Sequence, residues 1–314
     1  MKHVLNKDVQ GEFTYVIAPH KDPVLRIDSG DSIEVHTVDC FEGKVTSEKV
    51  KPSSVVVAPY VNPLCGPIWV EGAKPGDALR VNVLSIKPVG QYPKGVTSLQ
   101  NYSGLLGSKA TSLIDPWPEI VRMVDITEAG VVWDEDITFS LKPFIGTIGT
   151  AQPIVSIDSL TPGSHGGNMD LPDIAPGSTL YLPVRTEGAL LCLGDVHACQ
   201  GDGELCGTAI EMASITKIEV ELIKDLPLDI PRLEDKNRIM SIGSSKPLED
   251  AVAMAYNDLL HWMVGSYGFE KYDAYFVLTQ AGRVRVGNVV NPLYTVGAWI
   301  EKKYLEKKRN RSLV

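Results

Sequence analysis

The sequence lacks long apolar segments. None of its hydrophobic runs approaches the roughly 20 residues that a helix needs to cross a bilayer. Residues 1–8 contain no apolar stretch of the kind that forms the centre of a signal peptide. We therefore expect a protein that is neither inserted in a membrane nor exported, and that works in the cytoplasm.

Dense positive charge is also missing. The formal net charge is -9, and the one basic cluster lies within residues 302–311, at the end of the chain. Binding to a phosphate backbone requires a basic surface, so nucleic acid is not an expected partner. We interpret the terminal cluster as a solvated tail.

Several motifs that carry nucleophiles and cofactors are absent. The five cysteines form no Cys-x-x-Cys pair, which argues against a zinc site or redox pair of that type. No Gly-x-Ser-x-Gly elbow is present, and the glycines of residues 143–149 do not open a helix as a dinucleotide-binding loop does. Cys192, Cys199 and Cys206 recur at intervals of seven residues, and ligation of a soft metal is one interpretation of that spacing. We interpret the cysteines as reduced thiols, and thiol catalysis by Cys199 or Cys206 stays an alternative.

Glycine turns that lead into strands recur along much of the chain. Residues 27–35, 73–81 and 174–182 share this pattern, which is typical of antiparallel sheet. Toward the C-terminus the pattern changes. A helix is predicted to open at residues 245–250 and to end by Gly268, a second to run over residues 273–280, and a strand over residues 284–290.

These patterns predict an α+β, mostly β fold in three regions. A β-sandwich-like N-terminal region covers residues 1–145. A central β region, residues 146–224, holds the metal and catalytic loops. A C-terminal α/β region covers residues 225–314.

One stretch concentrates the polar chemistry. Residues 194–211 carry one imidazole, four carboxylates, one amide and four glycines between two apolar runs. Polar groups in such a position need hydrogen-bond partners or a metal. Asp195 and His197 are two residues apart, so an extended strand would direct both side chains to one point. His20 and Asp22 have the same spacing.

These residue types suit divalent metals. Nitrogen with carboxylate oxygen suits zinc, whereas an all-oxygen set drawn from Asp170, Asp202 or Glu204 suits calcium or magnesium. A second polar loop, residues 161–170, contributes His165. The alternative for the Gly-Asp-Gly around Asp202 is a tight turn in which the carboxylate caps its own backbone.

Four segments resemble those of the acetamidase/formamidase family. They are residues 19–25, 62–68, 161–170 and 194–211. The resemblance extends over nearly the whole chain, and its last two segments are the most specific. It implies a cytoplasmic amidohydrolase that cleaves a short aliphatic amide, such as formamide or acetamide, to a carboxylate and ammonia. It also implies bound zinc or calcium in a mostly β fold. Cys65, Val196 and Cys199 depart from the family pattern, which bears on substrate range more than on reaction class.

The resemblance and the residue types together suggest individual roles. A divalent metal, zinc first and calcium second, would polarise the amide carbonyl or acidify a bound water. Glu204 would be the general base, and Asn168 and Gln200 would hydrogen-bond the substrate amide. Asp170 would complete the metal shell or orient a histidine. The metal candidates are His165, Asp170, Asp195, His197, His20 and Asp22. The catalytic candidates are Glu204 and Asp202.

Two other classes stay open. A calcium-dependent β-sandwich binding module would use the same carboxylates without turnover. A non-haem iron enzyme would use two histidines and one carboxylate. Apart from a small amide substrate, the expected partner is a second copy of the chain, because a homodimer is the default for an enzyme of this size.

Overall fold

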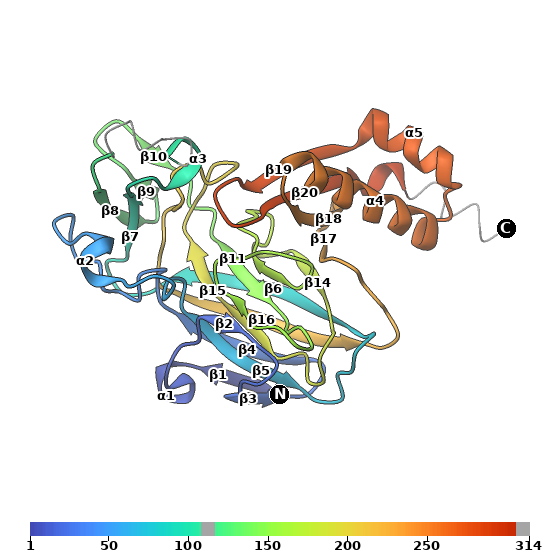
Figure 1. Ribbon diagram of the computed structural model, residues 1–314, viewed down its shortest axis with the longest axis horizontal. Coiled ribbons are helices and arrows are strands. Elements are labelled where there is room, and N and C mark those ends of the chain that lie inside the picture. Colours follow the sequence, from blue (N-terminus) through green and yellow to red (C-terminus); the bar gives the residue numbers. More distant parts are fainter. Residues whose placement is uncertain (108–116, 306–314) are drawn as a thin grey trace.

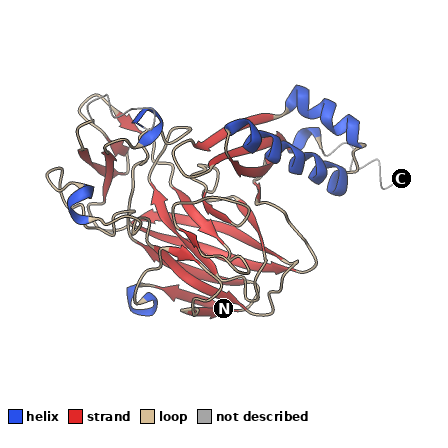
Figure 2. Cartoon of the chain, in the orientation of Figure 1, coloured by secondary structure: helices blue, strands red, loops and turns tan. Residues whose placement is uncertain are grey.

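The computed structural model describes residues 1–107 and 117–305. Strands dominate, and the two long helices lie together in the C-terminal part of the chain (Figure 2). The prediction of an α+β, mostly β protein is confirmed, and its sandwich-like arrangement stays a prediction. Within the described ranges, every helix is too short or too polar to cross a membrane.

The largest sheet has nine strands and takes them from all three regions that the sequence suggested. In spatial order they are β1 (Lys2–Leu5), β4 (Asp31–Thr37), β16 (Ser214–Ile223), β6 (Ala78–Pro88), β14 (Thr179–Pro183), β17 (Arg232–Glu234), β18 (Arg238–Ser245), β20 (Tyr294–Glu301) and β19 (Arg283–Asn288). Only the first pair, β1 with β4, is parallel. The three regions therefore share one hydrogen-bonded sheet.

A second sheet of five strands carries most of the site. Its order is β13 (Gly166–Asn168), β11 (Phe144–Gly149), β15 (Leu191–His197), β5 (Leu64–Val70) and β3 (Leu25–Ile27). A third sheet has four strands in the order β10 (Thr138–Phe139), β9 (Gly130–Val132), β8 (Ile120–Thr127) and β7 (Lys94–Leu99). A fourth sheet pairs β12 (Ile157–Asp158) with β2 (Val16–Ile17). The short helices are α1 (Lys7–Gln10), α2 (Pro52–Val55), α3 (Gly104–Gly107) and η1 (Lys302–Tyr304).

The main hydrophobic core lies between the two larger sheets. Val81 and Ile218 of the nine-stranded sheet belong to the same buried cluster as Ile148 and Leu193 of the five-stranded sheet. All four side chains are fully buried, and burial of each contributes roughly 1.5–3 kcal/mol. The core therefore holds the two sheets together and fixes the strands that carry the site.

The helices α4 (Leu248–Tyr267) and α5 (Lys271–Ala281) pack over β18 and β20 (Figure 1). Helix α4 ends where Gly268 adopts a left-handed conformation, φ 68°, a conformation that favours glycine. A methyl group at Gly243 would lie 2.4 Å from Ala251 O, so glycine lets α4 approach the sheet closely. Both predicted helices and the strand that follows them are confirmed, with ends that differ by one to three residues.

Candidate active site

The polar segments meet at the C-terminal end of β15. Asp195 and His197 occupy the last residues of that strand, and the chain then loops back to pair with it. Backbone bonds from Ala198 N to Ile210 O, 2.8 Å, and from Met212 N to Val196 O, 3.0 Å, close the loop. They place Glu211 opposite His197.

His197 is fully buried among carboxylates. Its Nε2 lies 3.4 Å from Asp195 Oδ1 and 3.2 Å from Glu211 Oε2. Asp195 and His197 therefore do face one point, although the backbone of Asp195 is left-handed and not extended as the spacing argument assumed. Neither approach has the direction of a hydrogen bond. His197 Nε2 and Glu211 Oε2 are therefore buried atoms with no hydrogen-bond partner in the described part of the chain.

Asn168 links the two aspartates of the site. In the orientation that its surroundings require, its amide donates to Asp170 Oδ1 at 3.0 Å and to Asp195 Oδ2 at 2.9 Å. The Thr147 hydroxyl also donates to Asp195 Oδ2, at 3.0 Å, and Asn291 Nδ2 donates to Asp170 Oδ2 at 2.6 Å. The Asn168 amide therefore has protein partners, and it positions carboxylates where the sequence suggested contact with substrate.

The Gln200 amide likewise forms hydrogen bonds with the protein. Its Nε2 donates to Asp170 O and Gly287 O, both at 2.9 Å. Its Oε1 lies 3.0 Å from His197 Nδ1. The sequence suggested that Gln200 binds substrate, but the structure gives both ends of its amide to the protein.

Burial raises the pKa values of three acids of the site, Asp170, Glu204 and Glu211. The pKa of Asp170 rises to about 8, from burial first and the charge of Asp195 second. The pKa of Glu204 is well above its usual range because the group is buried and lies near Asp170. Burial also raises the pKa of Glu211, although the neighbouring His197 opposes the rise. No Lys or Arg of the described ranges forms an ion pair with these acids. Protons or a cation must therefore balance their charge.

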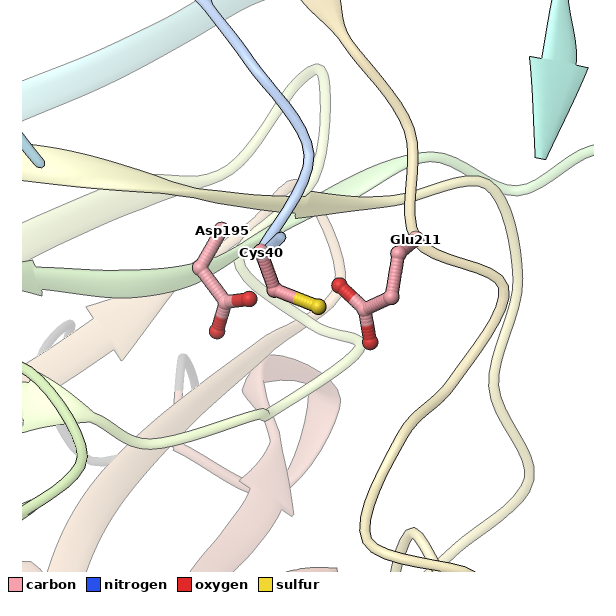
Figure 3. A group of neighbouring side chains, drawn as sticks. All are labelled: Cys40, Asp195 and Glu211. Atoms are coloured by element: carbon pink, nitrogen blue, oxygen red, sulfur yellow. The ribbon is translucent and has the colours of Figure 1, made fainter. Parts of the chain in front are cut away.

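Three overlapping groups of side chains could hold a cation. Within each group the ligand atoms lie within 4.8 Å of one another. The groups are Asp170 with Asp195 and His197, His197 with Glu204 and Glu211, and Cys40 with Asp195 and Glu211 (Figure 3). All of these residues are buried.

Backbone geometry keeps room for this cluster. A methyl group at Gly146 of β11 would lie 2.6 Å from Asp195 O and 2.8 Å from both Asp170 Oδ1 and Asp195 Oδ2. Asp170, Asp195 and Glu204 all have positive φ, at 45°, 55° and 50°. Such conformations cost of order 1–3 kcal/mol and gather at functional sites.

His165 lies outside the cluster, contrary to its predicted role as a ligand. Strand β13 pairs with β11 so that Gly166 is opposite Gly149 and Asn168 is opposite Thr147. His165 therefore lies at the far end of this short strand from Asp170. Burial lowers the pKa of His165 to about 4, and its Nε2 has no hydrogen-bond partner among the residues described.

Three other predicted residues lie at the surface. His20 and Asp22 are exposed in the turn between β2 and β3, and neither is a member of the three groups. Asp202 is also exposed, and it pairs with Arg285 at 3.2 Å. These positions give no contact with the cluster, because a turn between two strands carries such side chains out toward solvent.

Four residues of the site received no individual role from the sequence. They are Cys40, Thr147, Glu211 and Asn291. Glu211 was, however, among the four carboxylates of residues 194–211. Glu211 had a signal, because it is an acid inside an apolar segment that also includes Ile210 and Met212. The other three reach the site through long-range strand pairing, and no local pattern marks them.

Comparison with known proteins identifies the family of the chain. The Acetamidase/Formamidase family matches the chain over residues 15–160 and 154–297. A solved acetamidase from Yersinia enterocolitica has 50% identity and a TM-score of 0.95, with 97% of this chain and 93% of that chain covered. The acetamidase of Mycolicibacterium smegmatis is 32% identical over 51% of this chain and 53% of its own length. The formamidase of Methylophilus methylotrophus is 28% identical over 66% of this chain and 63% of its own.

The chain belongs to the acetamidase/formamidase family, which the sequence resemblance indicated. It spans between half and two thirds of the length of the curated relatives that it matches.

Proposed function

We propose that this protein hydrolyses short aliphatic amides to a carboxylate and ammonia at the cluster around His197. One observation carries the proposal. A chain of this family brings one imidazole and four carboxylates together in a buried site that no Lys or Arg of the described residues neutralises. Similarity to a solved acetamidase at 50% identity supports the same reaction class.

The donor set fits a divalent cation. His197 Nε2 and Glu211 Oε2 are buried without hydrogen-bond partners, and both are good metal donors. Asp170, Asp195 and His197 would hold the cation, with Glu211 beside them. When bound, a divalent cation would supply Lewis-acid polarisation of the amide carbonyl and of a nearby water.

Glu204 is the group that moves the proton. Its carboxylate would accept a proton from the attacking water, and its carboxylic acid would return that proton to the departing nitrogen. Water and amide thus become carboxylate and ammonia without net consumption of the side chain. A raised pKa suits this role, because a carboxylate whose pKa lies above its usual range is a stronger base toward the attacking water.

The donor set argues against the non-haem iron alternative. That centre requires two histidines and a carboxylate. Of the histidines in the described ranges, His197 alone belongs to the cluster. A binding module that uses calcium without turnover differs from an amidase in one measurable property, which is ammonia release.

The test is ammonia release from formamide and acetamide by protein of known metal content. The same protein is then treated with a chelator and reloaded with zinc. Activity that disappears on chelation and returns with zinc supports the proposal. Absence of ammonia from every short amide, with the cation fully bound, would overturn it and favour the binding module.

A further inference from the structure

The loop after β4 holds Cys40 in a fixed position. Asp39 Oδ1 accepts hydrogen bonds from Phe41 N at 2.9 Å and from Gly43 N at 3.0 Å. The backbone of Cys40 is held from the other side, where its oxygen accepts from Asn62 N at 3.0 Å. Cys40 is only 3% exposed. Its side chain therefore has little freedom to turn away from what it faces.

Cys40 faces the carboxylates of the site. Figure 3 shows its sulfur between Asp195 and Glu211, directed toward the Glu211 carboxylate. Ligand atoms of the three side chains lie within 4.8 Å of one another. Glu211 Oε2 is buried and has no hydrogen-bond partner among the described residues. An acidic oxygen left in this state costs free energy unless a cation or a proton reaches it.

A purely structural role of Cys40 explains the packing of its side chain but not the direction of its sulfur. Cys40 does pack with Phe41 and Val96 in a small apolar cluster, as buried cysteines often do. The thiols of Cys65 and Cys192, however, each donate to a backbone oxygen, at 3.4 and 3.8 Å. None of the residues described forms a hydrogen bond with Cys40 Sγ.

We propose that Cys40 is a thiolate ligand of the centre, on the side of Asp195 and Glu211, and that it makes the centre select thiophilic cations such as zinc over calcium. The inference rests on the proposed function, because it assumes that the cluster binds a divalent cation. On binding, the thiol loses its proton to solvent and the sulfur donates its electron pair to the cation. Thiolate ligands favour zinc and similar metals, whereas calcium takes oxygen ligands.

Cobalt tests the ligand directly, because thiolate coordination to Co²⁺ gives charge-transfer absorption in the near ultraviolet that oxygen and nitrogen ligands do not give. The protein is loaded with Co²⁺ in a background where the more exposed Cys199 and Cys206 are serine. We expect this absorption at one cobalt per centre. Cys40→Ser should lose the absorption while cobalt remains bound. Cys65→Ser, at a buried thiol outside the site, is the matched control and should keep it.

Metal selection provides a second measurement. In competition between zinc and calcium, Cys40→Ser should lower the preference for zinc by about tenfold or more. Removing a residue that only hydrogen-bonds to a metal ligand already costs about tenfold in affinity, and loss of a ligand should cost at least as much. Cys65→Ser should leave the preference unchanged.

The outcomes separate the two proposals. A protein that binds no stoichiometric divalent cation fails the metal-dependent function itself. A protein that binds cobalt without the thiolate absorption, or a Cys40→Ser protein that keeps it, overturns the role of Cys40 alone. The spectrum of the protein with Cys40 intact decides this point even if Cys40→Ser does not fold.

Discussion

His197 Nδ1 lies 3.0 Å from Gln200 Oε1, and the rest of the Gln200 amide fixes which atom donates. Gln200 Nε2 is bonded to two backbone oxygens, of Asp170 and Gly287, which can only accept. The oxygen must therefore face the imidazole, and His197 Nδ1 carries the proton. His197 Nε2 is then available for the cation that the proposed function requires, and a hydrogen bond behind a histidine ligand is typical of metal sites.

Removing that support should weaken the centre. Gln200→Leu takes away the acceptor of His197 Nδ1–H and both donors to backbone oxygens. We expect the affinity for zinc to fall by about 10–100-fold, measured in competition with a chromophoric chelator. His20→Asn changes an exposed histidine and should have no effect. An unchanged affinity in Gln200→Leu would contradict the assignment.

The two catalytic candidates should behave differently. Glu204→Gln removes a buried base, so kcat should fall by about 10²–10⁴-fold. The circular dichroism spectrum should not change. Asp202→Asn changes an exposed carboxylate that pairs with Arg285. It should leave kcat unchanged and alter the free energy of unfolding by no more than the ~0.5 kcal/mol typical of surface substitutions. Equal losses in the two variants would mean that the loop as a whole, and not Glu204, carries the reaction.

Space at Gly146 should be essential. Gly146→Ala places a methyl group 2.6 Å from Asp195 O and 2.8 Å from Asp170 Oδ1. We expect a loss of zinc binding, with a destabilisation of about 1–3 kcal/mol. Gly265→Ala, in an exposed turn of α4 with nothing within 4 Å of the new methyl, should instead raise stability by up to about 1 kcal/mol. Calorimetry and metal analysis of both variants check this. Full zinc content in Gly146→Ala would contradict the expectation.

Stability should depend on pH through His165. Burial lowers its pKa to about 4, below the roughly 6.5 of an exposed histidine. The unfolded chain therefore takes up the proton first as the pH falls. Stability is lost between about pH 6.5 and about pH 4, by roughly 3 kcal/mol, and this group removes no more below that window.

Denaturant unfolding of His165→Gln checks the effect. The difference in unfolding free energy between about pH 7.5 and about pH 4.5 should be smaller in the variant than in the parent, because glutamine does not titrate in this range. Identical differences would mean that His165 is protonated as easily in the folded protein as in the unfolded chain.

The expected homodimer has a testable surface. Tyr272, Tyr275 and Phe276 on α5 are 76%, 64% and 70% exposed, and this spacing puts them on one side of the helix. Phe269, which lies between α4 and α5 in the sequence, is buried in the hydrophobic cluster that these helices form with β18 and β20, so it is not available for a contact between subunits. Tyr272→Ser with Phe276→Ser should shift the sedimentation of the protein from dimer to monomer. A parent protein that sediments as a monomer would contradict the expectation.

The sequence revealed those parts of the site that are local. Asp195 and His197 share a strand end and lie close together, as predicted, and their role as metal ligands stays a prediction. The two long helices carry their own start and stop signals, and they were predicted correctly. Asn168 and Gln200 were correctly associated with the polar loops. Their roles were not, because their partners include side chains and backbone oxygens from distant strands.

Sequence proximity also misled. His165 is close to Asp170 along the chain, yet β13 separates them, and its pairing with β11 turns the two toward opposite ends. Cys40 and Asn291 are far from both loops in sequence. Their place in the site depends on sheet order, which a single sequence does not encode in a local pattern.

The span of the cluster along the chain has a consequence during synthesis. Its side chains run from Cys40 to Asn291, and β19 and β20 complete the large sheet near the end of the chain. A nascent polypeptide therefore cannot complete this site until residues 40–291 have been synthesised. If the cluster binds a cation, as the proposed function requires, the complete set of donors and their hydrogen-bond partners forms only after the strands have paired, so the cation would bind a folded site and would not act as a nucleus for folding.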